Sequence, residues 1–520
     1  MPGDVCLAID LGTGGPKVGL VGFDGSVIAQ ELHAVSTTFG ADGSAVQDAR
    51  EWWDVIRAGA RRLLGDHPLV APRVAAVAIT GQWASTVPVD ASGEPTGPCI
   101  TWQDTRGGPY VRDRIGGRVS GYGARHILRW VRTTGGAPSL SGADPVGHLL
   151  AFASEYPDAV ESTRWFLEPV DYLTMRFCGV ASATHASMQA AWLTDNRRLD
   201  HYAYDERLLA TLGLDGEKLA PLRPIGSVID TVSADVAHDL GISSDTVVIT
   251  GLPDLQSAAL GAGATSLYSA HLALSTTSWI SCPVPAKKTD VRHSIATVPG
   301  LTNDSYLVAN NQETGAKSLD WFRSMLAGAG QSLSYDDLTA LAATAPPGAR
   351  GVRFTPWLAG ERSPVEDLRV RGGFTNLSIT TDTADMARAV LEGVAANSRW
   401  LFSYVEKFCG RELNPVRIIG GGARSTLWCQ IFADTLNRPV EQVTDPMFAQ
   451  LRGMAALASV ALGQCTLADL EANRTPGRMF EPQSAGVEAM ATVSGSLPGL
   501  FRTSAAWSRR RAGAASDRPE

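Results

Sequence analysis

The sequence predicts an α/β protein made of two related domains in tandem, and two observations support this prediction. Short apolar runs with the character of buried strands, such as residues 74–79, are followed by stretches with helical periodicity. A hairpin pattern at residues 5–21, with an apolar strand, a polar turn and a second apolar strand, is echoed at residues 270–282. We therefore expect an N-terminal domain over residues 1–251 and a C-terminal domain over residues 252–498.

The composition is that of an ordinary globular protein. The chain has 520 residues, of which 44% are hydrophobic and 19% charged, so it is long enough for two domains with their own cores. The net charge is −8, and the only basic cluster, residues 509–511, lies in a stretch rich in small residues. We therefore expect no nucleic-acid partner, and we expect residues 499–520 to form a disordered tail.

Nothing in the sequence indicates export or a membrane. Asp4 and Asp10 are acidic and no basic region opens the chain, so a signal peptide is not expected. No apolar run approaches the roughly 20 residues that span a bilayer.

The seven cysteines are scattered without a CxxC pair, which favours a reduced, cytoplasmic protein without a cysteine metal site. Cys6, Cys178 and Cys409 lie among apolar neighbours, and we expect them to be core residues rather than reactive thiols.

The first hairpin carries the groups that an anion site needs. Its first strand ends in Asp10, and hard cations such as Mg²⁺ bind carboxylate oxygen and water. Gly12 and Gly14 allow backbone N–H groups to approach a phosphate closely, and the Thr13 hydroxyl can donate to it. Lys17 could reach a terminal phosphate as a point charge. An ordinary hairpin with a glycine turn and no ligand would explain the same residues.

The residues after the next predicted strand are ligand candidates. A helix is expected over residues 50–64 and a buried strand over residues 74–79. Gln82 and Trp83 follow that strand, and ligands of open α/β sheets bind at the C-terminal ends of strands.

Trp102, Asp104 and Arg106 together suit a polyhydroxylated ligand. The indole ring offers an apolar face to C–H groups, while the carboxylate and the guanidinium bind hydroxyls. The alternative is a surface Asp/Arg ion pair beside a core tryptophan, which is the commoner use of these residue types.

An acidic residue opens a helix of small residues near the middle of the chain. Residues 143–214 are mostly helical in pattern, and residues 247–250 form a buried strand. Asp254 follows at a helix N-terminus, where the helix dipole favours the carboxylate by about 0.3–1 kcal/mol. Asp254 is therefore a candidate for chemistry, and simple capping of the helix is the alternative.

Two turns in the C-terminal half could hold phosphate or a nucleotide. Thr276 and Thr277 lie in the hydroxyl-rich turn of the second hairpin. Farther on, a strand, a glycine turn and a helix N-terminus form an anion site and leave a flat surface for a purine or ribose. A glycine turn without a ligand is the alternative. The predicted elements here are a helix at 382–408, a strand at 416–419, the turn at 420–423 and helices at 425–436 and 451–462.

These segments, taken in order, resemble the FGGY family of carbohydrate kinases, which belongs to the actin-like ATPase superfamily. The resemblance covers residues 5–465, and no P-loop, dinucleotide fingerprint, zinc motif or nucleophile elbow competes with it. The segments that carry it are residues 10–13, 102–106, 251–261, 275–278, 360–364 with 371–373, and 420–425.

The resemblance implies two ribonuclease-H-like domains that flank a central cleft, with ATP and a sugar between them. Asp254 would bind the sugar and act as its general base, Asp10 would help to place Mg²⁺, and Gln82, Trp83, Trp102, Asp104 and Arg106 would line the sugar pocket. The residues implied to hold the nucleotide are Gly12, Thr13, Gly14, Lys17, Thr276, Thr277, Gly421, Gly422, Ala423 and Ser425. Family members are often dimers, so a homodimer is compatible with the resemblance.

Several departures from the family pattern bear on the substrate. Xylulokinases usually read Gly-Gln-Met-His-Gly where this chain has Trp83 and Ala84 in place of Met-His, so a hydroxyl partner is lost and bulk is added. Pro16 removes an N–H donor from the first loop, and Ser275 replaces a common glycine in the second.

We expect an ATP-dependent kinase that acts on a hydroxyl of a small sugar or polyol, with a xylulose-like ketopentose as the nearest guess. A kinase for a pentitol, gluconate or glycerol is the alternative within the class. A non-catalytic sugar- or nucleotide-binding relative is the alternative outside it. An actin- or heat-shock-like ATPase would leave residues 102–106 unexplained.

Overall fold

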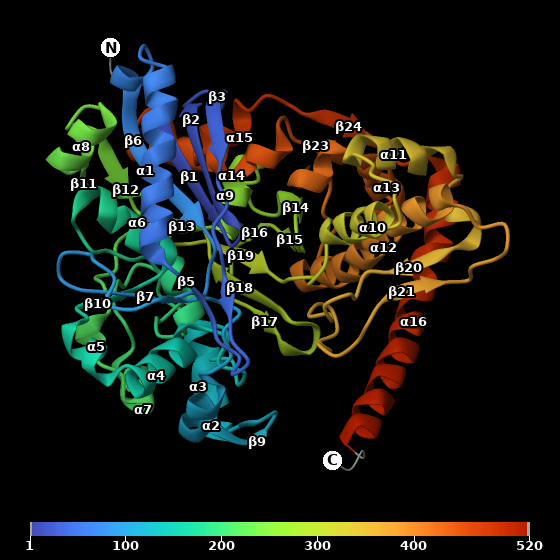
Figure 1. Ribbon diagram of the computed structural model, residues 1–520, viewed down its shortest axis with the longest axis horizontal. Helices are drawn as coiled ribbons and strands as arrows, with labels where there is room; N and C mark the ends of the chain where they lie inside the picture. The colour runs from blue at the N-terminus through green and yellow to red at the C-terminus, as the bar shows by residue number, and fades with distance from the viewer. Residues whose placement is uncertain (1–2, 517–520) are drawn as a thin grey trace.

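The computed structural model describes residues 3–516 and shows two halves, each built on a central sheet (Figure 1). The N-terminal sheet contains β1 (Val5–Gly12), β2 (Gly15–Gly22), β3 (Val27–Leu32), β6 (Val74–Gly81), β11 (Val228–Thr231) and β12 (Val247–Ile249), with β13 (Leu252–Pro253) paired to β6. The C-terminal sheet contains β14 (Ala270–Leu274), β15 (Ser278–Ser281), β22 (Val416–Ile419), β23 (Val440–Gln442) and β24 (Arg478–Phe480).

The two sheets repeat one topology. The order β2-β1-β6-β12-β11 in the first sheet corresponds to β15-β14-β22-β23-β24 in the second. In both, an antiparallel hairpin is followed by two parallel neighbours and then by an antiparallel strand. The predicted tandem of hairpin-opened α/β domains is therefore visible as a repeat of strand order and direction.

Alternation along β1 decides which side chains face which layer of helices. Leu7 and Ile9 pack in one core with Trp52 of α1 (Ala49–Asp66). Cys6 and Ala8 face the opposite core, which is formed largely by α14 (Ala449–Ala461). Because successive side chains of a strand point to opposite faces, Asp10 lies on the α14 side of the sheet at the end of β1.

Helices α9 (Asp254–Gly261) and α14 lie between the two sheets and join the halves. They approach so closely that a Cβ atom at Gly261 or Gly453 would clash with the backbone of the other helix. Leu260 of α9 packs in the core beneath the N-terminal sheet, whereas Leu255 packs with Trp279 of the C-terminal sheet. The small residues of α9 thus allow one helix to contact both domains.

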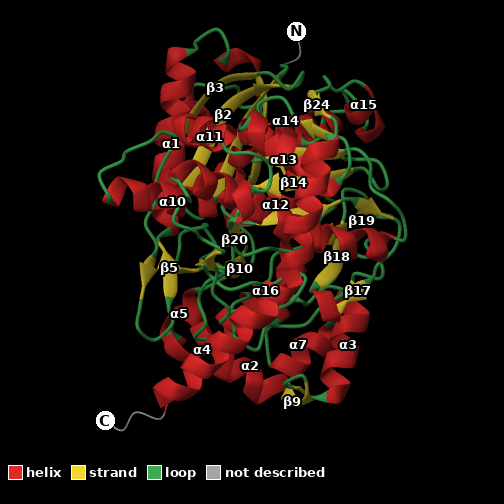
Figure 2. Ribbon diagram, turned by 90° about the vertical axis from the view of Figure 1, so that its right-hand side faces the viewer, coloured by secondary structure: helices red, strands yellow, loops and turns green. Residues whose placement is uncertain are grey.

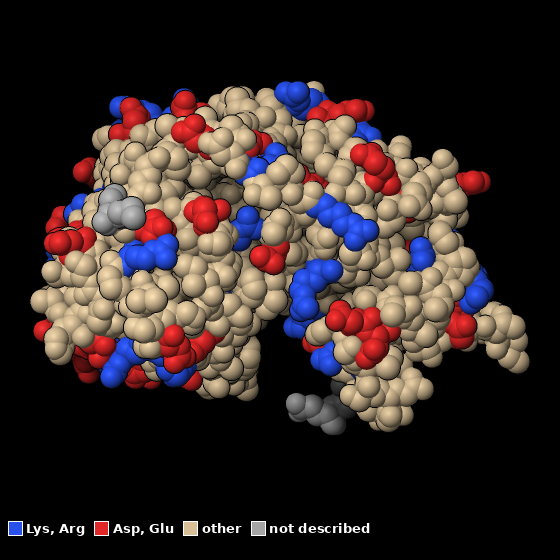
Figure 3. Space-filling model, turned by 90° about the horizontal axis from the view of Figure 1, so that it is seen from above, with Lys and Arg blue, Asp and Glu red and all other residues tan. Residues whose placement is uncertain are grey.

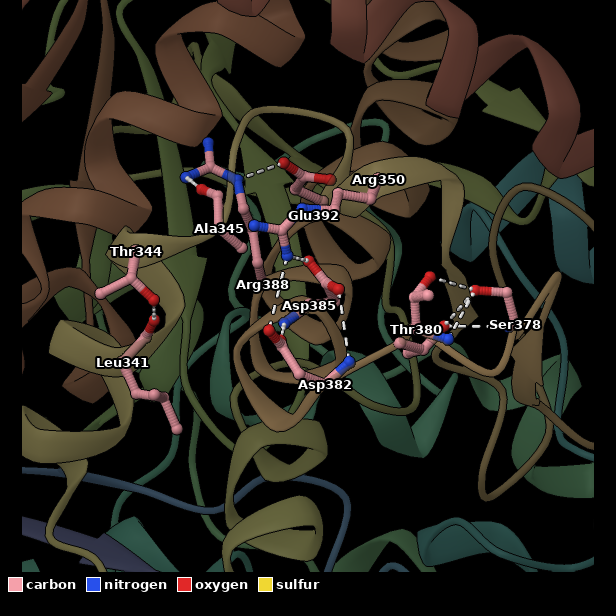
Figure 4. A network of polar contacts seen from close by, with 11 residues as sticks. Leu341, Thr344, Ala345, Arg350, Ser378, Thr380, Asp382, Asp385, Arg388 and Glu392 are labelled. Atoms are coloured by element: carbon pink, nitrogen blue, oxygen red, sulfur yellow. Dashed lines mark hydrogen bonds and ion pairs between the residues drawn. The ribbon is translucent and has the colours of Figure 1, made fainter.

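Helix α12 (Thr383–Cys409) lies in the C-terminal half, and charged groups hold its start in place (Figure 4). Asp382 caps it and forms a capping box with Asp385. Arg350 pairs with Asp385 at 2.7 Å, and Arg388 pairs with Glu392 at 2.7 Å on the same helix. These contacts anchor the N-terminal end of α12 to the loop that precedes β20 (Arg353–Thr355).

The remaining elements surround the two sheets, which helices enclose in both views (Figure 2). The other helices are α2 (Gly108–Ile115), α3 (Ala124–Thr134), α4 (Pro145–Glu155), α5 (Pro157–Ser162), α6 (Pro169–Cys178), α7 (Glu206–Leu212), α8 (Ala234–Leu240), α10 (Lys317–Gly328), α11 (Tyr335–Thr344), α13 (Thr426–Leu436) and α15 (Leu467–Ala472). The short strands are β4 (Thr38–Phe39), β5 (Ala45–Gln47), β7 (Val87–Val89), β8 (Cys99–Ile100), β9 (Gly116–Val119), β10 (Trp165–Leu167), β16 (Pro283–Val284), β17 (Thr289–Asp290), β18 (Ile295–Pro299), β19 (Tyr306–Ala309) and β21 (Gly373–Thr375).

The prediction of a disordered tail from residue 499 is wrong for the part of it that the structure describes. Helix α16 (Ser484–Ser516) runs through this segment and extends from the C-terminal half (Figure 1). Phe501 is 5% exposed and meets the rings of Trp357 and Trp400 edge-on at 4.9 and 5.4 Å. Small residues suggested disorder, but an apolar stripe at helical spacing docks the helix on the domain. Residues 517–520 lie outside the described part of the chain.

Charged side chains of both signs are interspersed over the face in Figure 3, which is hollowed between the two halves. Every helix found among residues 3–516 is too short or too polar to cross a lipid bilayer.

Candidate active site

The first predicted phosphate loop is the tip of the β1–β2 hairpin. Asp10 and Lys17 are partners across the two strands, and the Lys17 ammonium lies 2.7 Å from an Asp10 carboxylate oxygen. Thr13 and Gly14 lie at the tip, where Gly14 is exposed and Thr13 half-buried. Register alone therefore places the predicted cation ligand and the predicted phosphate-binding lysine side by side.

Asp254 is the first residue of α9 and lies close enough to Asp10 for their charges to interact. Burial first, and then the negative charge of Asp10, raise the pKa of the Asp254 carboxyl to about 7. Pro253 occupies the N-cap position of α9, so Asp254, the first residue of the helix, is not its N-cap. One turn along, Ser257 makes a 2.8 Å hydroxyl contact with Thr80 at the end of β6, which fixes the start of α9 over the ends of β1 and β6. A carboxyl with a pKa near 7 is suited to accept a proton at neutral pH.

The second predicted phosphate loop, residues 275–277, is held from behind by the segment that leads into α10. The Gly315 N–H donates to the Thr276 carbonyl at 2.9 Å, and the Ala316 N–H donates to the Ser275 carbonyl at 2.7 Å. A Cβ atom at Gly315 would clash with the Thr277 backbone, so glycine is required there. With its carbonyls bound at the back, the loop leaves Thr276 exposed and Thr277 half-buried at the front.

The predicted nucleotide turn lies against this second loop. Gly420 has a φ of 95°, and a Cβ atom there would lie 2.6 Å from the Leu274 carbonyl oxygen and 2.8 Å from the Ser275 hydroxyl. Gly421 is exposed and Gly422 half-buried, so these two residues present the flat backbone surface. The Ala423 methyl is buried in the core, and the Ser425 hydroxyl accepts the Trp428 N–H at the start of α13. Ala423 and Ser425 would therefore contact a nucleotide through their backbone atoms rather than through exposed side chains.

Trp102 connects the predicted sugar pocket to the first phosphate loop. Its indole N–H donates to the Thr13 hydroxyl at 3.0 Å. A second link runs through Gln47, whose side-chain amide donates to the Thr13 carbonyl at 2.8 Å and whose side-chain oxygen accepts from Gln82 at 3.0 Å. The Gln82 side-chain oxygen is buried and has no hydrogen-bond partner among the described residues. It is an acceptor left over for a ligand hydroxyl.

Trp83 has its polar atom engaged elsewhere. The indole N–H donates to the Ser187 carbonyl at 2.9 Å, and the ring packs against the cluster that contains Leu255 and Trp279. Trp83 can therefore offer a ligand an apolar surface, next to the residue that follows Asp254.

Asp104 and Arg106 form a buried ion pair. Asp104 is wholly buried, and its oxygens accept from the Arg106 guanidinium at 2.7 Å and from the Ala45 N–H at 2.9 Å. Arg106 also pairs with Glu155. In this arrangement the pair holds the segment around Trp102 in place. The alternative of a surface ion pair beside a core tryptophan is wrong, because Asp104 is buried and Trp102 is half-buried, and direct contact with a sugar stays a prediction.

Three residues of the site carried no clear signal in the sequence: Gln47, Gly315 and Glu168. Gln47 is one glutamine in a three-residue strand, and its role depends on neighbours far away in the chain. Glu168 accepts the Ser85 N–H at 3.2 Å beneath the loop that carries Trp83, and burial raises its pKa well above the ordinary value. The one feature of the sequence that points to Glu168 is its position in the mostly apolar segment 166–173, where a charged side chain is unusual.

The chain is similar to known proteins over most of its length. Residues 5–261 match the N-terminal domain of the FGGY family of carbohydrate kinases, and residues 271–462 match the C-terminal domain. A xylulose kinase from Staphylococcus epidermidis is 28% identical over 487 residues, which cover 92% of this chain and 93% of that protein. A gluconokinase from Bacillus subtilis is 24% identical over 441 residues, covering 84% and 83%.

Solved structures show the same fold. The crystal structure of gluconate kinase from Lactobacillus acidophilus has a TM-score of 0.82 at 23% identity and covers 96% of this chain and 99% of that one. The predicted fold of two domains and the predicted enzyme class, an ATP-dependent carbohydrate kinase, are therefore confirmed. The two family models match in order and together span most of the sequence, and the chain belongs to the FGGY family of carbohydrate kinases.

Proposed function

We propose that this kinase transfers the γ-phosphate of ATP to a terminal hydroxyl of a xylulose-like ketopentose, with Asp254 as the general base. The observation that carries the proposal is the position of Asp254 at the start of α9, beside Asp10, with a pKa of about 7. Xylulose is the nearest guess because xylulose kinases stand among the relatives that match most of the chain.

Asp254 would take the proton of the attacking hydroxyl as the oxygen–phosphorus bond forms. Positioned general bases contribute typically about 10²–10⁴-fold to a rate. The proton stays on the Asp254 carboxyl while the phosphoryl group leaves ADP. With a pKa near 7, a substantial fraction of the Asp254 carboxyl groups is ionised at neutral pH and can accept the proton.

The two hairpin loops would hold the phosphates from opposite domains. Lys17 and Thr13 extend from the first domain, and Thr276 and Thr277 extend from the second. Preorganised donors of this kind are the main source of catalysis in phosphoryl transfer, because they stabilise charge on the transferring group. Gly421 and Gly422 would lie against the nucleotide.

The donor set at Asp10 fits Mg²⁺. Asp10 offers carboxylate oxygen beside a second carboxyl, Asp254, and Mg²⁺ in kinases is bound through one or two carboxylates plus substrate phosphates. Among residues 3–516, no three His, Cys, Asp or Glu side chains are grouped to hold a metal by themselves. Bound with ATP, Mg²⁺ would neutralise phosphate charge, and Lys17 would then be free to turn from Asp10 to a phosphate.

The pocket would recognise the sugar through a few groups of the N-terminal half. The unpartnered Gln82 oxygen accepts a hydroxyl, and the rings of Trp83 and Trp102 provide apolar walls. Trp83 and Ala84 in place of a Met-His pair remove one partner for a substrate hydroxyl. Gluconate is the second candidate, because gluconokinases stand among the relatives that match most of the chain.

The deciding experiment measures ADP release with Mg-ATP across a panel of pentuloses, pentitols, hexoses, aldonates and glycerol. We expect one pentulose to give the highest kcat/KM, and Asp254→Asn to abolish its turnover while ATP still binds. Maximal turnover with gluconate would show that gluconate, and not a pentulose, is the substrate. Unchanged turnover in Asp254→Asn would refute the assignment of Asp254 as general base, and turnover unaffected by EDTA would refute the proposed use of Mg²⁺.

A further inference from the structure

Two cysteines that are far apart in the sequence meet in the C-terminal half. Cys282 follows β15 directly, and Cys409 is the last residue of α12. Their sulfur atoms lie 3.7 Å apart, and both cysteines are free thiols. Cys409 had been expected from its apolar neighbours to be an inert core residue, but its side chain is half-buried and its sulfur faces a second thiol.

The surroundings of Cys409 favour its thiolate. The Lys288 ammonium donates to the Phe408 carbonyl at 2.7 Å, and the Arg411 guanidinium stacks on the Tyr268 ring at 4.5 Å. The hydrogen bond from Cys282 comes first, and the charges of Lys288 and Arg411 add to it, so the pKa of Cys409 falls below its ordinary value. Burial and the negative charge of Glu406 oppose this effect. The hydrogen bond with Cys409, and then burial, raise the pKa of Cys282 well above its ordinary value.

The geometry points to Cys282 and Cys409 as a reversible dithiol site, at which a hydroperoxide or a small-molecule disulfide would join the end of β15 to the end of α12. Neither cysteine belongs to the phosphate loops or the sugar pocket, so the site is separate from the proposed chemistry. Cys178, Cys429 and Cys465 form no such pair in the described part of the chain.

The reaction with hydrogen peroxide has two balanced steps. The Cys409 thiolate attacks a peroxide oxygen, which forms a sulfenic acid and releases water after protonation. The Cys282 sulfur then attacks the sulfenic sulfur, which forms the S–S bond and releases a second water. The two thiols together lose two protons and two electrons, and the peroxide is reduced to water.

Formation of the bond needs only a local movement. The sulfurs must approach from 3.7 Å to the roughly 2.05 Å of a disulfide. Cys409 is the last residue of α12, and Gly410, which follows it with a φ of 71°, caps the helix, so a movement of Cys409 involves only the helix end. The product would tie the strand that follows the second phosphate loop to the long helix behind it.

The test treats the full-length protein with hydrogen peroxide, alkylates the remaining thiols and identifies linked peptides by mass spectrometry. We expect a Cys282–Cys409 link that dithiothreitol reverses, with five of the seven cysteines still alkylated. Cys282→Ser and Cys409→Ser should each abolish the link, whereas Cys429→Ser, the matched control at a buried cysteine, should keep it.

A second measurement does not depend on the buried Cys282 variant folding. The rate of Cys409 alkylation by iodoacetamide at pH 7 should fall several-fold in Lys288→Gln, because a cation that favours the thiolate is lost. Oxidation of Cys409 to sulfinic acid without a link would overturn the proposal. Disulfide links formed in equal yield between other pairs of cysteines would also overturn it. A rate of Cys409 alkylation that is the same in Lys288→Gln as in the wild type would overturn it as well.

Discussion

The Trp102 indole nitrogen lies 3.0 Å from the Thr13 hydroxyl, so a residue of the predicted sugar pocket holds a residue of the first phosphate loop. Asp104 and Arg106, buried as an ion pair, keep the segment of Trp102 in position. The contact joins the predicted sugar pocket to the predicted first phosphate loop, a link that the place of Trp102 in the sequence did not suggest.

Trp102→Phe keeps the ring and removes the donor to Thr13. A hydrogen bond contributes about 0.5–1.5 kcal/mol, so we expect kcat/KM for ATP to fall roughly two- to tenfold. Steady-state kinetics at varied ATP concentrations will measure this kcat/KM. The control is Trp130→Phe, which removes an indole bond to the Trp192 carbonyl outside the site. Equal effects of the two variants would show that the Thr13 contact has no special role.

Asp254→Asn should lower kcat about 10²–10⁴-fold, because the group that accepts the proton is lost while the side-chain volume is kept. ATP binding, measured by calorimetry, should change little. Asp235→Asn is the matched control, since Asp235 also lies in the first turn of a helix, α8. A turnover in Asp254→Asn close to that of the control would contradict the assignment.

The pH profile of kcat/KM should show an acid limb with an apparent pKa near 7, the value to which burial and Asp10 raise the Asp254 carboxyl. The base works only when ionised, so activity falls as pH drops below this value and levels off above it. Lys17 lowers the pKa of Asp254, so Lys17→Met should move the limb to higher pH whatever its effect on the maximum rate. Lys218→Met, at a lysine bound to the Val160 and Thr163 carbonyls, should leave the limb in place. A limb near pH 4 in the wild type would exclude Asp254 as the titrating base.

Trp83→His should change the sugar preference more than the affinity for ATP. The substitution removes the indole bond to Ser187 and part of the apolar wall, and it adds a hydroxyl partner. We expect relative kcat/KM values across the sugar panel to shift by roughly tenfold or more, with KM for ATP within about twofold. Trp165→His in β10 is the control. An unchanged sugar profile would place Trp83 outside the pocket.

Phe501→Ala should destabilise the C-terminal half, because a buried ring that contacts Trp357 and Trp400 is removed. Core Phe→Ala substitutions cost about 3–5 kcal/mol, whereas Phe39→Ala, at a side chain 65% exposed, should cost less than about 0.5 kcal/mol. Urea denaturation followed by fluorescence will compare the two. If Phe501→Ala behaves like Phe39→Ala, the docking of α16 contributes little to stability.

Local sequence patterns were sufficient for several of the helices and strands. The strand at 416–419 and the helices around residues 50–64 and 382–408 are present within two residues of the predicted bounds, because apolar periodicity and capping residues are local signals. The tail after residue 499 was mispredicted because its order comes from docking against residues 357 and 400, which no local window contains.

By itself the sequence determined the tandem α/β fold, the family and the identity of the charged and hydroxyl groups in the two predicted phosphate loops. Only the tertiary structure decided which of these groups touch. It buried the ion pair of Asp104 and Arg106 and turned the Trp83 N–H towards Ser187. It also brought Gln47 to Thr13, and Cys282 to Cys409 across 127 positions of sequence. The physical reason is that burial and pairing depend on how sheets and helices pack between distant segments, and that packing has no trace in the composition of either segment alone.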